Sequence, residues 1–210
     1  MNDCSFIASS TEAPTSDKRR AILDAALTLF ADRGYANTPV PLVAERAGVA
    51  TGTLYRYFDS KESLVNSIFR EGKLAMAAAL PIASDGRGGP SDWPRAVFDR
   101  WWSGLWDFAS ADPVLFRFLE THHHAPYLNA ASSAGARAID AAAEVFVAAA
   151  QQAGVFRPGD PAALVALVFG AFVGLVRGGL NVEANRSTSE DAAWSLLAVP
   201  PSSPTRKAIH

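Results

Sequence analysis

The chain has 210 residues, 49% of them hydrophobic, which suits one large domain or a small domain joined to a larger one. The net charge is −2, and acidic and basic residues are equally frequent in residues 1–80, so bulk charge does not indicate nucleic-acid binding. A single cysteine, Cys4, excludes an internal disulfide and favours a cytoplasmic protein.

The first segment, residues 1–15, is rich in Ser and Thr and lacks the basic start and apolar run of a signal peptide. We therefore expect a disordered arm. A helix is predicted from about residue 17, capped by Ser16 or Thr15 and ended by Gly34. Its apolar stripe at helical spacing consists of Ile22, Ala25, Ala26, Leu29 and Phe30.

Two short helices joined by a turn at Gly48 are predicted next. Thr38 is expected to cap the first of them. Pro39 and Pro41 fall in its first turn, where no intrahelical amide bond is lost. The spacing is typical of a helix-turn-helix, in which the second helix enters the major groove of DNA.

The second helix of this pair is predicted over about 51–58. At 100° per residue, Leu54 and Phe58 form its buried face. The opposite face and flanks carry side chains suited to phosphates and base edges, namely Gly52, Thr53, Tyr55, Arg56 and Tyr57. A fourth helix capped by Ser60 or Asp59 places Lys61 beside free amides, where a phosphate can bind.

These residues resemble the TetR family of bacterial transcriptional regulators over about 17–66. The matching segments are AILDAALTLFADRGY, TPVPLVAERAGV, GTLYRYF and SKESL. The resemblance implies an all-helical homodimer, with a small DNA-binding domain followed by a larger domain that binds an inducer and dimerises. The DNA contacts that it implies are Thr38, Thr51, Gly52, Thr53, Tyr55, Arg56, Tyr57 and Lys61.

Three positions depart from the family pattern. Pro41 stands where the family often has a polar or basic residue, and Thr51 often corresponds to a lysine or arginine. Ala50 replaces the usual capping serine and leaves Thr51 as a weaker substitute cap. We therefore expect fewer electrostatic contacts and a shallower salt dependence of DNA binding.

After a Gly- and Pro-rich loop at 81–90, a helix over 93–110 is apolar nearly all round and is expected to be enclosed by other helices. Its tryptophans either pack in the core or line a pocket for a hydrophobic or aromatic ligand. The candidate ligand contacts in the chain are Trp101, Trp102, Trp106, Phe118, His122, His123, Phe172 and Arg177.

A helix is expected to start at Asp112-Pro113 and to carry His122, His123 and His124. Consecutive helical positions point about 100° apart, so one metal ion does not easily take all three, and we predict no metal site. The histidines are instead expected to be solvated, to cap the helix end, or to hydrogen-bond in a pocket.

Three more helices are predicted, over 134–153, from Asp160-Pro161 to Leu180, and over 189–199. Their longest apolar run, 162–176, is shorter than the roughly 20 residues that a membrane span needs. Glycines four residues apart in it favour close helix contact at a subunit interface. With the family resemblance, the expected dimer contacts are Gly170, Val173, Gly174, Trp194 and Leu197.

The sequence thus predicts an all-α fold with a helix-turn-helix domain at 16–62, a fourth helix that bridges onward, a ligand-binding and dimerisation domain at 63–199, and a disordered tail at 200–210. The predicted function is that of a regulator, more often a repressor, released from operator DNA by a small hydrophobic or aromatic inducer. The alternative is a helical small-molecule or lipid-binding protein whose helix-turn-helix does not work. An enzyme is disfavoured because the sequence has no phosphate-binding loop, nucleophile elbow or HExxH motif, and no cofactor is expected.

Overall fold

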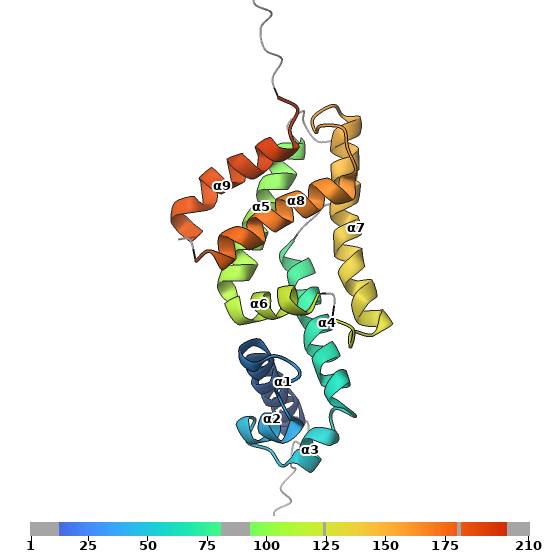
Figure 1. The fold of residues 1–210 in the computed structure, drawn as a ribbon, viewed down its shortest axis with the longest axis vertical. Helices are drawn as coiled ribbons and strands as arrows, with labels where there is room; N and C mark the ends of the chain where they lie inside the picture. Colours follow the sequence, from blue (N-terminus) through green and yellow to red (C-terminus); the bar gives the residue numbers. More distant parts are fainter. Residues whose placement is uncertain (1–12, 81–92, 124, 180–181, 201–210) are drawn as a thin grey trace, which may run out of the picture. The chain divides into compact units, whose positions relative to one another are not determined.

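The computed structural model describes residues 13–80, 93–123, 125–179 and 182–200, and in these ranges the fold is all-α, as predicted (Figure 1). The helices are α1 (Ala13–Arg33), α2 (Val40–Arg46), α3 (Thr51–Tyr55), α4 (Lys61–Ala79), α5 (Trp93–Ala111), α6 (Pro113–His122), α7 (Ala130–Gln152), α8 (Pro161–Arg177) and α9 (Val182–Leu197). Residues 1–12 of the expected arm, the expected loop at 81–90 and residues 201–210 of the expected tail lie outside the described ranges.

The chain folds into two compact units. The amino-terminal unit extends to Lys73 and also includes Val114–Ser133, so it contains α1 to α3, most of α4 and α6, and the first turn of α7. The carboxy-terminal unit comprises Leu74–Pro113 and the chain from Ala134 onward. The sequence did not indicate that α6 belongs to this unit, where its Phe118 stacks on Phe30 of α1.

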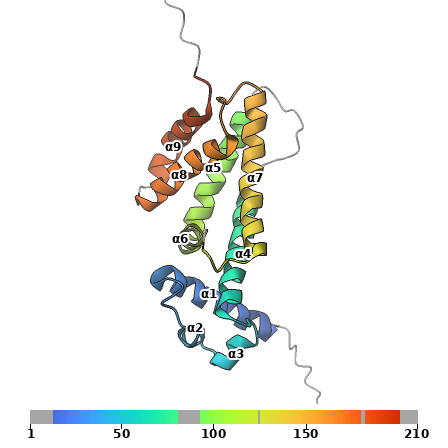
Figure 2. The ribbon, with the colours of Figure 1, turned by 45° about the vertical axis from the view of Figure 1, so that its right-hand side comes forward.

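The core of the amino-terminal unit forms on α1. Its predicted stripe is confirmed, since the side chains from Ile22 to Phe30 at helical spacing are buried. The helix starts at Ala13, about four residues earlier than expected, and ends at Arg33, just before Gly34, whose φ of 78° is left-handed. Helix α2 packs on α1, and α3 packs on α2 (Figure 2).

The carboxy-terminal unit is built around the aromatic side chains of α5. Helices α8 and α9 lie side by side in both ribbon views, and α9 also packs on α5 (Figures 1 and 2). The turn after α7 pairs with the end of α9 through an isolated antiparallel bridge between Phe156 and Ala198.

Two helix boundaries in the carboxy-terminal half differ from the sequence prediction. Helix α9 begins at Val182, seven residues before the predicted start, because its first turns lack the apolar stripe that signals a helix. Within these first turns, Arg186 forms an ion pair with Asp107 of α5. Helix α6 ends at His122, before the rest of the predicted segment, where the chain turns.

Candidate functional site

The helix-turn-helix is formed by α2, α3 and the turn between them. Gly48 has a φ of 67°, a conformation that a side chain disfavours, and its amide donates to the carbonyl of Glu45 at 3.1 Å. Helix α3 ends at Tyr55, earlier than predicted, and residues 56–57 form a turn. Leu54 and Phe58 are nevertheless both buried and orient this segment.

The outer face of α3 is open and polar. Gly52 and Arg56 are exposed, Tyr55 is 48% exposed, and a side-chain carbon added to Gly52 would meet no atom within 4 Å. Within the described chain, Arg56 makes no ion pair or side-chain hydrogen bond. The structure therefore brings together seven of the predicted DNA contacts, of which the half-buried ones are Thr51, Thr53, Tyr57 and Lys61.

Thr38 does not belong to this face, and the structure corrects its two assigned roles. Its side chain is 0% exposed. Its hydroxyl donates to the carbonyl oxygen of Gly34 at 2.8 Å and lies 3.3 Å from that of Leu29, so it satisfies the end of α1. The residue that caps α2 is Pro39, without a side-chain hydrogen bond.

The two following helix starts differ in their caps. Ala50 caps α3 without a side-chain hydrogen bond, and Thr51 does not substitute for it. In contrast, the predicted cap at Ser60 is confirmed, because its hydroxyl accepts from the amide of Ser63 at 3.0 Å. The first turn of α4 is thus held in place where Lys61 lies.

Lys61 lies against Tyr35 rather than extending freely into solvent. Its Nζ is 4.2 Å from the centroid of the Tyr35 ring, and burial lowers the pKa of Lys61. The hydroxyl of Tyr35 donates to Glu62 Oε1 at 2.9 Å. Burial first, and then this contact with the carboxylate, raise the pKa of Tyr35, while hydrogen bonds from its own backbone and from Tyr35 lower the pKa of Glu62.

Sequence reasoning missed Tyr35 and the buried Asn66. Asn66 lies in α4 beside apolar side chains, and its amide group donates to the carbonyls of Glu62 and Tyr127, each at 2.8 Å. The Tyr127 ring stacks on Tyr35 at 4.0 Å, and its hydroxyl hydrogen-bonds to His122 Nδ1. A polar residue within the apolar stripe of α4 was the available signal for Asn66.

The predicted ligand contacts fall in different units. Phe118, His122 and His123 belong to the amino-terminal unit, where the first two rings lie 4.4 Å apart. Burial lowers the pKa of His122. The remaining predicted contacts belong to the carboxy-terminal unit and are Trp101, Trp102, Trp106, Phe172 and Arg177.

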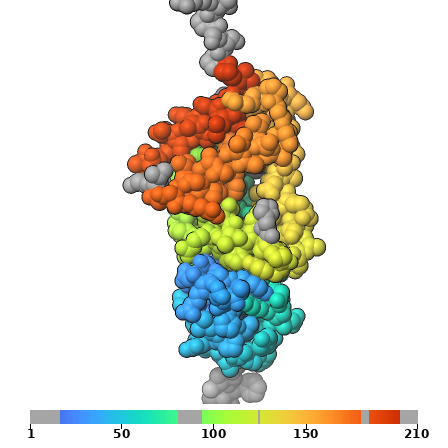
Figure 3. Space-filling view, viewed as in Figure 1, coloured from blue at the N-terminus to red at the C-terminus, as the bar shows by residue number. Residues whose placement is uncertain are grey.

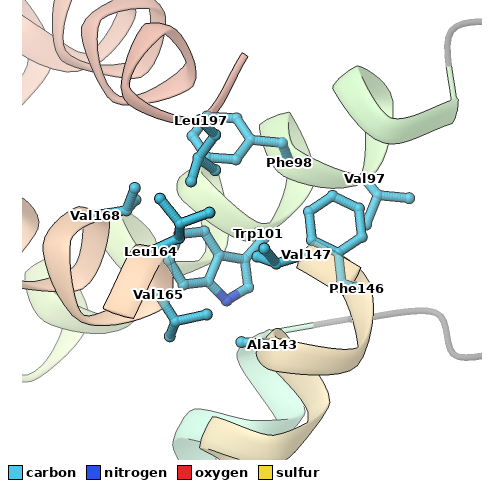
Figure 4. Close-up of a pocket in the computed structure, with 10 residues that line it drawn as sticks. All are labelled: Val97, Phe98, Trp101, Ala143, Phe146, Val147, Leu164, Val165, Val168 and Leu197. Carbon is cyan, nitrogen blue, oxygen red and sulfur yellow. The ribbon is translucent and has the colours of Figure 1, made fainter. Parts of the chain in front are cut away.

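The tryptophans of α5 divide between core and cavity. Trp102 and Trp106 are fully buried and meet Phe172 edge-on, with centroids 5.5 and 4.9 Å away, so they form core. Trp101 instead faces a cavity of about 20 Å³ between α5, α7, α8 and α9 (Figure 4). Arg177 is exposed at the end of α8.

All ten side chains around this cavity are apolar (Figure 4). Sequence reasoning had named only Trp101 as a ligand contact among them. The others are Val97, Phe98, Ala143, Phe146, Val147, Leu164, Val165, Val168 and Leu197. A space of this size holds about one water molecule, so a larger ligand requires these side chains to move.

The predicted dimer contacts lie on two sides of α8 and α9. Gly170 and Gly174 are exposed on the outer face of α8, which is uncovered in the space-filling view (Figure 3), and Val173 is half-buried. Leu197 is only 3% exposed and faces the cavity. Trp194 is half-buried, packs edge-on against Phe98 and Phe156, and lies under the Arg95 guanidinium.

None of the described helices is long and apolar enough to cross a bilayer. In the same ranges, no three His, Cys, Asp or Glu side chains are grouped so as to hold a metal ion.

Two family models match the chain. Residues 22–68 match the bacterial regulatory proteins of the tetR family, and residues 89–194 match the tetracyclin repressor-like carboxy-terminal domain. The second match alone covers half of the chain and lies outside the helix-turn-helix.

Curated relatives are similar over the first of these segments. The HTH-type transcriptional repressor KstR2 of Rhodococcus jostii (strain RHA1) is 51% identical over 55 residues, 26% of this chain and 27% of the relative. The fatty acid metabolism regulator protein of Bacillus subtilis (strain 168) is 44% identical over 54 residues, 26% of this chain and 28% of the relative. The chain thus matches about a quarter of the length of these relatives.

Solved structures are similar over most of the chain. A TetR family transcription regulator from Marinobacter aquaeolei VT8 has a TM-score of 0.73 at 27% identity, over 88% of this chain and 97% of that one. A regulatory protein of the tetR family from Rhodococcus RHA1 has a TM-score of 0.73 at 17% identity, over 88% and 98%, which shows the fold alone. Both family models match the chain, and the open polar face of α3 agrees with them. The chain therefore belongs to the TetR family of bacterial transcriptional regulators, which are DNA-binding proteins and not enzymes.

Proposed function

We propose that the protein is a homodimeric repressor that binds operator DNA through α3 and the first turn of α4, and that an apolar ligand in the carboxy-terminal unit releases it. The two relatives similar over the helix-turn-helix are named as a transcriptional repressor and as a fatty acid metabolism regulator. The mechanism is an equilibrium between two spacings of the recognition helices, of which DNA selects the one that reaches two major grooves one turn apart. Coupling is reciprocal, so operator DNA weakens ligand binding by the same factor as ligand weakens DNA binding.

The observation that carries the DNA-binding part is the open face of α3. Gly52 permits close approach of the backbone to a groove, and Arg56 is a guanidinium without a partner within the described chain. Lys61 adds a cation at the start of α4. Together these groups provide the phosphate and base-edge contacts that a recognition helix needs.

The test is a fluorescence titration of the purified protein against DNA upstream of its own gene, at several salt concentrations. Arg56→Ala and Lys61→Ala should each weaken binding about tenfold or more, and Lys61→Ala should reduce the salt slope by about 1. Arg137→Ala is the matched control, because Arg137 is an exposed arginine on α7 without an ion pair among described residues.

Unchanged affinity in both variants would contradict the contact assignment. If the wild-type protein does not prefer this DNA over a scrambled duplex, selection from a random-sequence library decides whether it has another operator. Failure to enrich any sequence there would favour the alternative of a ligand-binding protein with an inactive helix-turn-helix.

The outer face of α8 supports the homodimer. Its exposed side chains are all apolar over three turns, and Leu167 is 62% exposed. Such a continuous apolar surface is typical of an interface, and small residues on it allow close approach of a second helix. The face consists of Ala163, Ala166, Leu167, Gly170, Ala171 and Gly174.

The apolar cavity beside Trp101 supports the ligand. A suitable first probe is decanoate, whose alkyl chain matches an apolar lining, tested by the rise in melting temperature that a ligand of the native state produces. Val168→Phe fills the cavity from its buried wall and should abolish the rise. An equal rise in this variant would place the ligand elsewhere.

A further inference from the structure

The position of the Lys61 ammonium is unusual for a cation at a helix start. Lys61 is the first residue of α4, where a positive charge is opposed by the helix dipole and by the free amides. Its long side chain also has many rotamers available in solvent. The ring of Tyr35, 4.2 Å from Nζ, offers the ammonium a negative face and thereby favours one placement.

Tyr35 is itself held on three sides. Its hydroxyl donates to Glu62 at 2.9 Å, beside Lys61 on the same helix turn. One ring contact is the stack on Tyr127, at 4.0 Å and 25° between planes, and another is the tilted contact with Phe30 of α1 at 5.6 Å. The ring is therefore a fixed platform, and the cation on it has fewer conformations to lose when it binds an anion.

We propose that Tyr35 is a positioning residue for DNA binding, whose ring holds the Lys61 ammonium where it contacts a backbone phosphate. This inference rests on the proposed function, because it needs Lys61 to contact DNA. Burial lowers the pKa of Lys61, which indicates that the ammonium has already lost part of its hydration shell. Contact with a phosphate therefore removes less water from it.

The placement is tested first without DNA. In the NMR spectrum of the free protein, the ring current of Tyr35 should shift the ε-methylene protons of Lys61 upfield. Tyr35→Phe keeps the ring and should keep the shift, whereas Tyr35→Leu should abolish it. An unshifted wild-type signal would overturn the proposal whatever the protein binds.

The consequence is tested by a double-mutant cycle on a duplex that the wild-type protein selects from a random-sequence library. Tyr35→Leu should weaken binding about two- to fivefold and reduce the salt slope in the same direction as Lys61→Ala. In the Lys61→Ala background, Tyr35→Leu should add no further loss of affinity. Tyr35→Phe should retain most of the wild-type affinity and slope.

A merely structural role is separated by a control beside the same end of α1. Thr38→Val removes a buried hydroxyl without touching Lys61, so it should lower the active fraction and leave the slope unchanged. The inference would be overturned if Tyr35→Leu behaved like this control. In that case Tyr35→Leu would keep the wild-type salt slope of DNA binding, and its loss of affinity would add to that of Lys61→Ala in the double variant. A wild-type slope in Lys61→Ala would overturn it too, whereas failure of the wild-type protein to select any duplex would refute the proposed function itself.

Discussion

Ser132 donates a hydrogen bond to Oδ1 of Asn66 at 2.7 Å, although 66 residues separate them in the chain. The same oxygen accepts from the backbone amide of Asn129 at 2.8 Å, while the amide group of Asn66 donates to the carbonyls of Glu62 and Tyr127. One buried side chain thus attaches the turn before α7 and the first turn of α7 to α4 within the amino-terminal unit.

Asn66→Ala should lower the free energy of unfolding by about 2–4 kcal/mol, because it leaves the buried hydroxyl of Ser132 and the part-buried amide of Asn129 without their acceptor. Urea unfolding followed by circular dichroism measures the loss. Ser67→Ala is the matched control on the same helix, since its hydroxyl bonds only within α4, to the carbonyl of Ser63 and from Arg70. A loss in Asn66→Ala no larger than in this control would show that the attachment contributes little.

Thr38→Val should cost about 1–2 kcal/mol of stability, because the valine keeps the volume but not the hydroxyl that satisfies the end of α1. Affinity for DNA per folded molecule and its salt slope should stay at the wild-type values. A DNA titration that also counts the fraction of protein able to bind measures the affinity and the salt slope. Thr38→Ser, which keeps the hydroxyl, is the control. A reduced slope in Thr38→Val would restore Thr38 as a DNA contact.

Gly104→Ala should destabilise the carboxy-terminal unit by about 1–3 kcal/mol or more. A side-chain carbon at this position of α5 would overlap the backbone oxygen of Ala79, which cannot rotate away as a side chain does. The control is Gly135→Ala on α7, where the added carbon meets nothing within 4 Å and should stabilise the helix by about 0.5–1 kcal/mol. Thermal unfolding compares the two, and equal melting temperatures would contradict the packing at Gly104.

Glu190→Gln should change the pH dependence of stability. Burial, followed by the hydrogen bond and charge of Asp99, raises the pKa of Glu190 to about 6 from an ordinary value of 4.5. The folded state therefore favours the protonated carboxyl, and the resulting stability is complete below pH 4.5 and is lost as the pH rises through 6. The loss is about 2 kcal/mol at most, since one pKa unit corresponds to 1.36 kcal/mol.

The measurement for Glu190 is urea unfolding between pH 4 and pH 8. The glutamine variant should lack the decline and should exceed the wild-type protein in stability above pH 6. Glu45→Gln is the control, because Glu45 is an exposed carboxylate without an ion pair in the described chain. It shows how much an ordinary glutamate-to-glutamine change alters the pH dependence of stability. Parallel pH curves for the wild-type and Glu190→Gln proteins would contradict the raised pKa.

Gly170→Leu should raise the dimer dissociation constant at least tenfold. A side chain at Gly170 has open space in the single chain, but a close helix contact with a second copy would leave no room for it. Sedimentation velocity over a concentration series measures the dissociation. Gly135→Leu adds the same side chain to the exposed surface of α7 and should leave the dimer intact; equal behaviour of both variants would move the interface away from this face of α8.

The sequence by itself determined the helices with a strong local pattern and the turns that need glycine. The stripe from Ile22 to Phe30 and the left-handed Gly34 and Gly48 depend on residues only a few positions apart, so spacing was enough to predict them. The open face of α3 followed in the same way from the burial of Leu54. The first turns of α9 were missed because they carry no such pattern.

The tertiary structure decided which of these side chains are available to a ligand or to DNA. Thr38 is buried because the end of α1 needs its hydroxyl, and Leu197 faces a cavity because α5, α7 and α8 surround it. Tyr127 reaches Tyr35 across 92 positions of the chain. Contacts of this kind depend on how distant segments pack, and helical periodicity specifies only which face of each helix is apolar.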